Sequence, residues 1–454
     1  MRSLPKLAQR KVIYYLFWAG CFIAAIIILP SYLGSLIAKN QWQMLWFLAL
    51  GLLIIALYFS EFRYLIFCTA VVMLLANNQN DRIVIIFGSL RWIFLITMAV
   101  VAAAHWVLGR VPSRIRFMDL WAVAFLGLAF YSQSYSITPA LTFERSVSTA
   151  LFYLAVFWGV WIYIQDESKI PVIARDLVKI SFLFLLVGLI SLTQNRFFGA
   201  FSNPNSVGVF SAILAPLAFW SYLCERKQYA LILITLIAIG LFFSQSRGGI
   251  ISTAVSVAYF LMLYRRKHAH ALIILFFFLG ASLLYAELFG SSFFQQYFRW
   301  ENLATGGGRL EAWKEVIRLI ALRPWWGYGF GTEDQLFIKF DIVFLEHAGA
   351  YAHNSYIGLI SQLGFIGAFI FFVPLILFFL NNAYQVSRIV SDQERWLGLA
   401  LNASILGGLA NAFFESWLYS AGNSFTFPFW VIVIMAYQMA HAVTREKAGE
   451  IAKA

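Results

Sequence analysis

The sequence predicts an all-α protein, a polytopic bundle of transmembrane helices that forms a single integral membrane domain over residues 1–454. Of these residues 61% are hydrophobic and only 12% are charged, whereas soluble domains are about 45–50% apolar and about 25% charged. Apolar stretches long enough to cross about 30 Å of hydrocarbon recur along the whole chain, and no shift in composition marks a domain boundary. We therefore expect about 12–14 membrane spans. Their centres lie near residues 25, 52, 70, 96, 125, 155, 185, 215, 237, 257, 280, 367, 405 and 432.

The distribution of basic residues predicts the orientation of this bundle. A net charge of +12 would suggest a nucleic-acid partner for a soluble protein, but in a membrane protein it indicates loops held in the cytoplasm. The apolar stretch that starts at Val12, after four basic side chains, is too long for a cleaved signal peptide and indicates a signal-anchor. Most of the 33 Lys and Arg residues then fall on the cytoplasmic side. Both termini are predicted to be cytoplasmic, and residues 289–353 are predicted to form one large outer loop.

This outer loop is predicted to contain an amphipathic helix over residues 309–322. Its apolar side chains recur at three- and four-residue spacing with charged residues between them, as in a helix that lies at a membrane surface. The apolar positions are Leu310, Trp313, Val316, Ile317 and Ile320. Arg323-Pro324 ends the helix, and residues 325–331 are too rich in glycine for regular structure. The rings of Trp325 and Trp326 would either stack on sugar faces or form part of an aromatic belt at the interface.

The predicted topology also sorts the histidines. Of the six, only His347 and His353 are expected outside, and His353 stands where the chain re-enters the membrane. A histidine titrates near neutral pH and can act as a base, although at a helix start it is also a common capping or interface residue. His353 is therefore the histidine that we single out as a candidate base.

Two outer arginines are candidates for binding an anion. Arg247 stands in a short turn between two spans, where a charge so close to hydrocarbon is costly unless it has an anionic partner. Arg309 follows three glycines and opens the amphipathic helix, where the helix dipole already favours negative charge. Either could be structural on its own. Together, on one face, they suggest a phosphate or diphosphate ligand.

Metal and nucleotide sites are not predicted, and no cofactor is expected. Cys21, Cys68 and Cys224 lie in or at the edges of spans, so they offer neither a disulfide framework nor a thiolate metal site. The glycines at 327–331 lack the Lys-Ser/Thr of a phosphate-binding loop. The carboxylates of the outer loop have no metal-ligand spacing and are expected on a solvated face. They are Glu333, Asp334, Asp341 and Glu346.

Several short motifs lie in a fixed order over about residues 201–371. The most specific is His353-Asn354 followed by nine residues and Gly364-Phe365-Ile366-Gly367. Other elements are Ser246-Arg247, Gly308-Arg309 with Trp313, the stretch from Pro324 to Gly329, and Asn203-Pro204-Asn205. Together these motifs resemble the O-antigen ligase and O-antigen polymerase superfamily of bacterial membrane glycosyltransferases. The first 200 residues match only as generic spans.

The resemblance implies transfer of a glycan from an undecaprenyl-diphosphate carrier to an acceptor hydroxyl at the periplasmic face of the bacterial inner membrane. By motif, His353 would orient or deprotonate the acceptor, and Arg247 and Arg309 would hold the donor diphosphate. Substrate contacts are expected at Asn354, Trp313, Trp325, Trp326 and Asn205. The family implies no metal or nucleotide.

The resemblance leaves the acceptor open. Ligases attach finished glycan to lipid A-core, polymerases join repeat units into O-antigen or exopolysaccharide, and protein-directed members modify Ser or Thr. These last tend to have a longer C-terminal region, so we expect a glycan or lipid A-core acceptor. A transporter of small anions and a non-catalytic polysaccharide-assembly protein remain alternatives. Against a transporter, only Arg91 and Lys179 are basic residues well within spans, and no internal repeat is visible.

Overall fold

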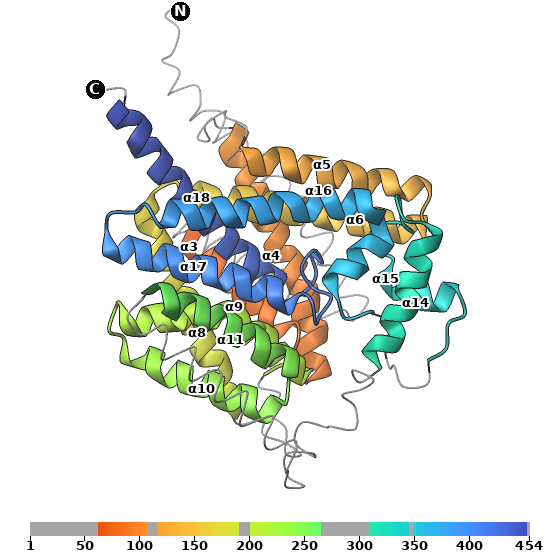
Figure 1. The fold of residues 1–454 in the computed structure, drawn as a ribbon, viewed down its shortest axis with the longest axis horizontal. Coiled ribbons are helices and arrows are strands. Elements are labelled where there is room, and N and C mark those ends of the chain that lie inside the picture. Colours follow the sequence, from red (N-terminus) through yellow and green to blue (C-terminus); the bar gives the residue numbers. More distant parts are fainter. Residues whose placement is uncertain are drawn as a thin grey trace, which may run out of the picture.

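The computed structural model describes residues 62–107, 116–189, 200–264, 308–344, 349 and 351–451, and within these ranges the chain forms helices and no strand (Figure 1). The predicted spans centred near residues 25, 52 and 280, the loop residues 289–307, His347 and Glu346 lie outside the described residues. The helices are α3 (Phe62–Leu75), α4 (Asp81–Val107), α5 (Phe117–Tyr131), η1 (Ser132–Ser134), α6 (Pro139–Tyr153), η2 (Leu154–Val160), α7 (Trp161–Tyr163), η3 (Glu167–Lys169), α8 (Ile170–Gly188), α9 (Pro204–Leu223), α10 (Gln228–Ser244), α11 (Arg247–Tyr264), α14 (Arg309–Leu322), α15 (Glu333–Lys339), α16 (Ser355–Val386), α17 (Asp392–Asn411) and α18 (Thr426–Ile451).

The helices confirm an all-α, multi-pass membrane protein. Within the described ranges, five helical stretches are long and apolar enough to cross a membrane, and three shorter apolar helices accompany them. The five are Asp81–Val107, Pro139–Tyr163, Pro204–Leu223, Arg247–Tyr264 and Ser355–Val386. Every predicted span centre that falls on described residues lies inside a helix. The full count of about 12–14 spans stays a prediction, as does the single domain.

Helix α9 lies at the centre of one half of the bundle and is buried along nearly its whole length. It packs against α8, α10, α11 and α17. At its crossing with α11, a Cβ on Gly208 would lie 2.5 Å from the Cα of Gly249, so only glycine allows this approach. The close crossing holds the N-terminal ends of α9 and α11 side by side.

The predicted amphipathic helix is confirmed as α14, with the predicted bounds, but its buried face is rotated from the expected one. The buried residues are Ala312, Val316, Leu319 and Ile320, whereas Leu310 and Ile317 are 40% and 55% exposed. The reason is a small core of the outer segment itself, in which α14 packs against Tyr328, Leu336 and Phe337. Figure 1 shows α14 and α15 together at one end of the bundle, away from the projecting end of α18.

Helix α16 is interrupted near its start, and the interruption receives the glycine-rich turn of the outer segment. Gly364 has φ +66°, and a Cβ there would lie 2.1 Å from the Trp325 carbonyl. The N–H groups of Tyr328 and Gly329 donate to the carbonyls of Ser361 and Gln362 at 2.9 and 2.8 Å. The glycine of the His-Asn motif therefore allows a close backbone approach, which attaches the outer segment to α16.

Candidate active site

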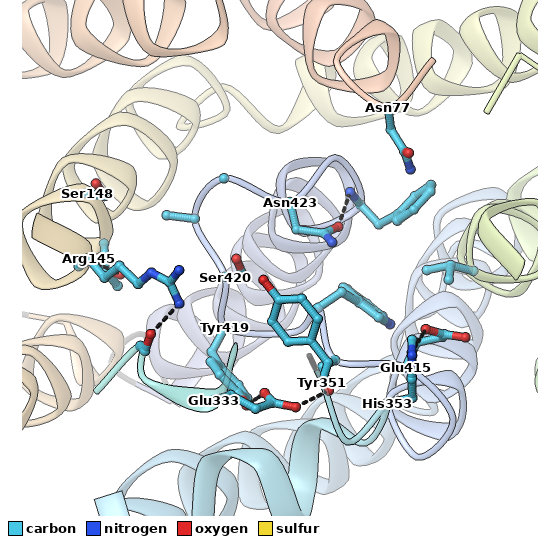
Figure 2. Close-up of a pocket in the computed structure, with 18 of the residues that line it drawn as sticks. Asn77, Arg145, Ser148, Glu333, Tyr351, His353, Glu415, Tyr419, Ser420 and Asn423 are labelled. Carbon is cyan, nitrogen blue, oxygen red and sulfur yellow. Dashed lines mark hydrogen bonds and ion pairs between the residues drawn. The ribbon is translucent and has the colours of Figure 1, made fainter. Parts of the chain in front are cut away.

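A polar cavity of about 530 Å³ opens where the predicted outer connections meet. Its walls come from α4, α6, the start of α9, the turn that leads into α15, residues 351–353 and the α17–α18 connection. His353 and Glu415 lie together on one side, and Arg145 and Ser148 lie across the cavity from them (Figure 2). Segments far apart in the sequence thus form one site.

The Glu415 carboxylate joins three of the residues that the sequence singles out. Its Oε2 lies 2.9 Å from Nδ1 of His353. Its Oε1 accepts hydrogen bonds from Nη2 of Arg309 at 2.7 Å and from Nδ2 of Asn205 at 2.9 Å. The three side chains come from the residue before the cap of α16 and the starts of α14 and α9, so one carboxylate holds three helix starts together.

The charge state of Glu415 follows from these contacts. Burial alone would raise the pKa of its carboxyl, but the hydrogen bond from His353 and the charge of Arg309 outweigh burial and hold the pKa below its ordinary value. The ionised carboxylate can only accept hydrogen bonds. A neutral His353 must therefore carry its proton on Nδ1, which leaves the basic lone pair on Nε2.

The backbone of His353 is in an unusual conformation, with φ +51°. A non-glycine residue in this region costs about 1–3 kcal/mol and persists only when its surroundings fix it. Asn354, which follows, caps α16: its side chain accepts the N–H groups of Tyr356 and Ile357, at 2.9 and 3.2 Å. Asn354 is 2% exposed and does not line the cavity, so its contacts are those of a capping residue rather than the predicted substrate contact.

Trp313 also forms a hydrogen bond with the backbone next to His353. Its Nε1 donates to the Ala352 carbonyl at 2.7 Å, and its ring packs edge-on against Phe413. It does not line the cavity. Among the predicted substrate contacts, the cavity lining includes Asn205 but not Trp313 or Asn354.

Trp325 and Trp326 lie away from the cavity. They are 62% and 47% exposed, and their rings contact Phe365 and the Tyr131–Tyr135 pair respectively. Both are at an outer surface of the segment, where the aromatic-belt interpretation suits them better than sugar stacking in the cavity.

Arg247 lies close to the site but outside the cavity lining. It is the first residue of α11, and a Cβ on the next residue, Gly248, would lie 2.6 Å from the Phe414 ring. Because Phe414 precedes Glu415, this packing sets the start of α11 beside the Glu415 cluster.

No motif in the sequence pointed to Glu415, the central residue of this cluster. A signal was present: it is the only Asp, Glu, Lys or Arg between Arg395 and Arg445. A lone carboxylate between two apolar spans is expensive unless it is functional or paired.

Two further cations of the cavity wall were also not predicted. Nη1 of Arg91, within the predicted span α4, donates to the Gly422 carbonyl. Arg145, on α6, forms an ion pair with Asp334 at 2.6 Å. The described part of the chain shows no carboxylate at ion-pair distance from Arg91.

The predicted solvated face for the outer-loop carboxylates is wrong for Glu333. Its side chain is buried, 4% exposed, and lies in the cavity wall near Tyr419 (Figure 2). Burial raises the pKa of its carboxyl. The sequence pattern failed here because α15, which Glu333 begins, packs inward against α16. Among the described residues, no group of three or more His, Cys, Asp or Glu side chains is arranged to hold a metal ion.

Comparison with known proteins finds a matching family and a related protein. Residues 230–372 match the model of the family described as O-antigen ligase. The chain is also 28% identical over 244 residues to the ComP-specific O-oligosaccharyltransferase of Acinetobacter baylyi, and the match covers 50% of this chain and 44% of that relative. The matched part is thus less than half the length of the relative. Arg247, Arg309 and His353 lie within the family match, whereas Asn205 and Glu415 lie outside it.

Proposed function

Because the chain belongs to the O-antigen ligase superfamily, we propose that it is a glycosyltransferase that moves a glycan from an undecaprenyl-diphosphate-linked donor to an acceptor hydroxyl. We assign the reaction to the polar cavity beside His353, at the periplasmic face of the bacterial inner membrane. The observation that carries the proposal is the Glu415 carboxylate, which holds His353, Arg309 and Asn205 together. This arrangement places a base in the wall of the cavity and holds the positive charge of Arg309, which does not line the cavity, against the same carboxylate.

His353 is the proposed base. Its Nε2 takes the proton of the acceptor hydroxyl while the acceptor oxygen attacks the anomeric carbon of the donor sugar. The bond from that carbon to the diphosphate oxygen breaks, and undecaprenyl diphosphate leaves with the bonding electrons. Glu415 stabilises the imidazolium that forms, through its contact with Nδ1. A base of this kind contributes about 10²–10⁴-fold to the rate.

Arg309 and Arg247 are the proposed partners of the diphosphate. A guanidinium has five N–H donors, and one nitrogen of Arg309 serves Glu415, so the others suit an anion at the start of α14. Positive charge placed where the leaving group gains negative charge lowers the barrier directly. The Gly248–Phe414 packing supports a position for Arg247 near the same end.

The remaining cavity wall suits a glycan. Amide side chains gather there, those of Asn77, Asn203, Asn205 and Asn423, together with serine hydroxyls and the ring of Tyr351. Amides both donate and accept hydrogen bonds, as sugar hydroxyls do. We therefore propose that this wall, rather than Trp325 and Trp326, contacts the sugars. Asn354 and Trp313 are proposed to support the backbone around His353.

The acceptor is proposed to be a glycan or a lipid A-core hydroxyl, in a ligase or a polymerase reaction. The name of the Acinetobacter relative describes an O-oligosaccharyltransferase specific for ComP. That name supports keeping a protein hydroxyl as the alternative acceptor.

The test is complementation of a deletion strain with His353→Ala, Arg247→Ala and Arg309→Ala, with immunoblots of membrane fractions to match protein levels. Polysaccharide length and attachment are analysed together. Long polymer that stays on the carrier indicates a ligase, and single units without long chains indicate a polymerase. Loss of glycan from a protein alone indicates a protein acceptor.

The same strains separate the proposal from its alternatives. Normal glycan from all three variants would exclude the catalytic assignment and favour a scaffold. Normal transfer combined with loss of anion uptake by membrane vesicles would indicate a transporter instead.

A further inference from the structure

The carboxylate of Glu333 is directed at the backbone on either side of His353. Its Oε1 accepts the Ala352 N–H at 3.1 Å and the Ser416 hydroxyl at 2.7 Å. Its Oε2 lies 3.2 Å from the hydroxyl of Tyr419, beside it in Figure 2. Glu333 therefore contacts the peptide group between Tyr351 and Ala352, which is one peptide group away from His353.

Ser416 links the Glu333 carboxylate to the backbone on the other side of His353. Its Oγ accepts the N–H of Asn354 at 3.0 Å while its hydroxyl donates to Glu333. The peptide group between Tyr351 and Ala352 and the peptide group after His353 are thus both linked to one carboxylate, the first directly and the second through Ser416. These contacts flank the residue that has φ +51°.

We propose that Glu333 is a positioning residue, which fixes the left-handed backbone of His353 through Ala352 and Ser416 and so aims the imidazole at Glu415 and the cavity. The inference rests on the proposed function, since it assigns Glu333 to the orientation of the base. It gives a buried acid of the outer segment a part in the reaction.

The physical basis is the instability of the His353 conformation. An L-residue leaves the left-handed region when nothing holds it. Rotation of the backbone would swing the imidazole away from Glu415, and a base misplaced by about 1 Å can cost about 10²-fold in rate. A glutamine at position 333 keeps Oε1 as an acceptor for both Ala352 and Ser416. An alanine removes that acceptor and leaves both donors without it.

The test compares Glu333→Gln, Glu333→Ala and Ser416→Ala in the full-length protein in proteoliposomes. The donor is lipid-linked glycan extracted from the deletion strain. Asp176→Ala is the matched control, because Asp176 is also a buried carboxylate, bonded to Arg63 at 2.5 Å in another part of the bundle. Three quantities are measured: kcat, the KM for the donor, and the rate at which diethyl pyrocarbonate modifies His353, followed by mass spectrometry.

Glu333→Gln should keep kcat within about threefold of the wild type, and Glu333→Ala should lower kcat by about 10²-fold with little change in KM. Ser416→Ala should fall between them. The modification rate of His353 should change in Glu333→Ala and stay unchanged in Asp176→Ala. Equal losses in Glu333→Gln and Glu333→Ala, or an unchanged modification rate in Glu333→Ala, would overturn the proposal.

Failure of this inference is distinguishable from failure of the proposed function. If His353→Ala is inactive while Glu333→Ala has wild-type kcat, only the positioning role is lost. If His353→Ala retains full activity, the proposed function fails whatever Glu333 does.

Discussion

Two parts of the molecule place an arginine beside a carboxylate, but the two pairs differ in their surroundings. At the start of α5, Arg116 and Asp119 are 5% and 7% exposed, and all three nitrogens of the guanidinium are bonded, to Asp119 and to the Phe157 carbonyl. At the cavity, Glu415 is shared by Arg309, His353 and Asn205, and it borders the polar cavity.

The difference separates a structural pair from a reactive one. Arg116 also stacks over the rings of Trp158 and Trp161, so its charge is enclosed by protein on every side. Arg309 is 23% exposed and His353 is 26% exposed. A closed pair contributes to stability alone, whereas a carboxylate that several groups share beside a cavity can also direct chemistry.

The largest expected effect is on the rate, from Glu415→Gln. The amide cannot stabilise an imidazolium or fix the His353 tautomer, so the rate of glycan transfer should fall by at least about 10²-fold. Transfer is measured in proteoliposomes with extracted lipid-linked glycan. A wild-type rate would show that Glu415 is no more catalytic than Asp119.

The matched change at the closed pair is Asp119→Asn. Because it leaves Arg116 buried without its counter-charge, the free energy of unfolding should fall by about 3–5 kcal/mol. The transfer rate per folded molecule should stay at the wild-type level. Thermal unfolding in detergent measures the first quantity, and the proteoliposome assay measures the second. If Asp119→Asn lowered the transfer rate per folded molecule without lowering stability, the two pairs would not differ in the way proposed.

Arg91→Gln should have an intermediate effect. Arg91 lines the cavity and, unlike Arg116, has no carboxylate at ion-pair distance in the described structure. If its guanidinium bonds an anionic group of the donor, its loss should raise the donor KM about tenfold. Arg82→Gln, an exposed position on the same helix, is the control. An unchanged KM would mean that Arg91 only anchors the Gly422 carbonyl.

The two carboxyl groups of the site, those of Glu415 and Glu333, should make the free energy of unfolding depend on pH in opposite directions. The pKa of Glu415 is held low by His353 and Arg309 against the effect of burial, so its stabilisation is present above the ordinary carboxyl pKa and is lost as pH falls through the lower folded value. Burial raises the pKa of Glu333, so stability is lost as pH rises from the ordinary value through the raised one. The measurement is the melting temperature as a function of pH. Glu415→Gln should abolish the loss of stability at low pH, and Glu333→Gln should abolish the loss as pH rises above the ordinary carboxyl pKa. Unchanged profiles in both variants would contradict these shifts.

The smallest effect is expected from Trp325→Ala and Trp326→Ala. Both rings are exposed and lie outside the cavity lining, so each change should alter the transfer rate by less than about twofold. Trp313→Ala, which removes the donor to the Ala352 carbonyl, should lower the rate more. A larger loss from Trp325 than from Trp313 would restore the outer aromatic residues as substrate contacts.

Much of the helical architecture could be predicted from the sequence because lipid imposes strong rules on length and polarity. The bounds of α14, the turn before Arg247 and the start of α16 after His353 all follow from local patterns. The packing of the outer segment could not be predicted in this way. Its own small core rotated the buried face of α14, and contacts from α16 and the α17–α18 connection buried Glu333.

For the candidate site, motifs located His353, Arg309 and Asn205 but not the group that joins them. Glu415 is 62 residues from His353 and 106 from Arg309 along the chain. No periodicity links positions so far apart, so their contact depends on how the helices pack. Trp325 and Trp326 show the opposite error, since a local pattern of aromatic and glycine residues does not reveal which way the rings face.

The break at Gly364 constrains the order in which the protein can assemble. The turn at residues 327–329 is made before α16 during synthesis, yet its N–H groups find their partners on the carbonyls of Ser361 and Gln362. The outer segment therefore cannot complete its backbone hydrogen bonds until the first turns of α16 have formed. His353 lies between these two partners in the chain, so the site should acquire its final form late in folding, after the segment has docked.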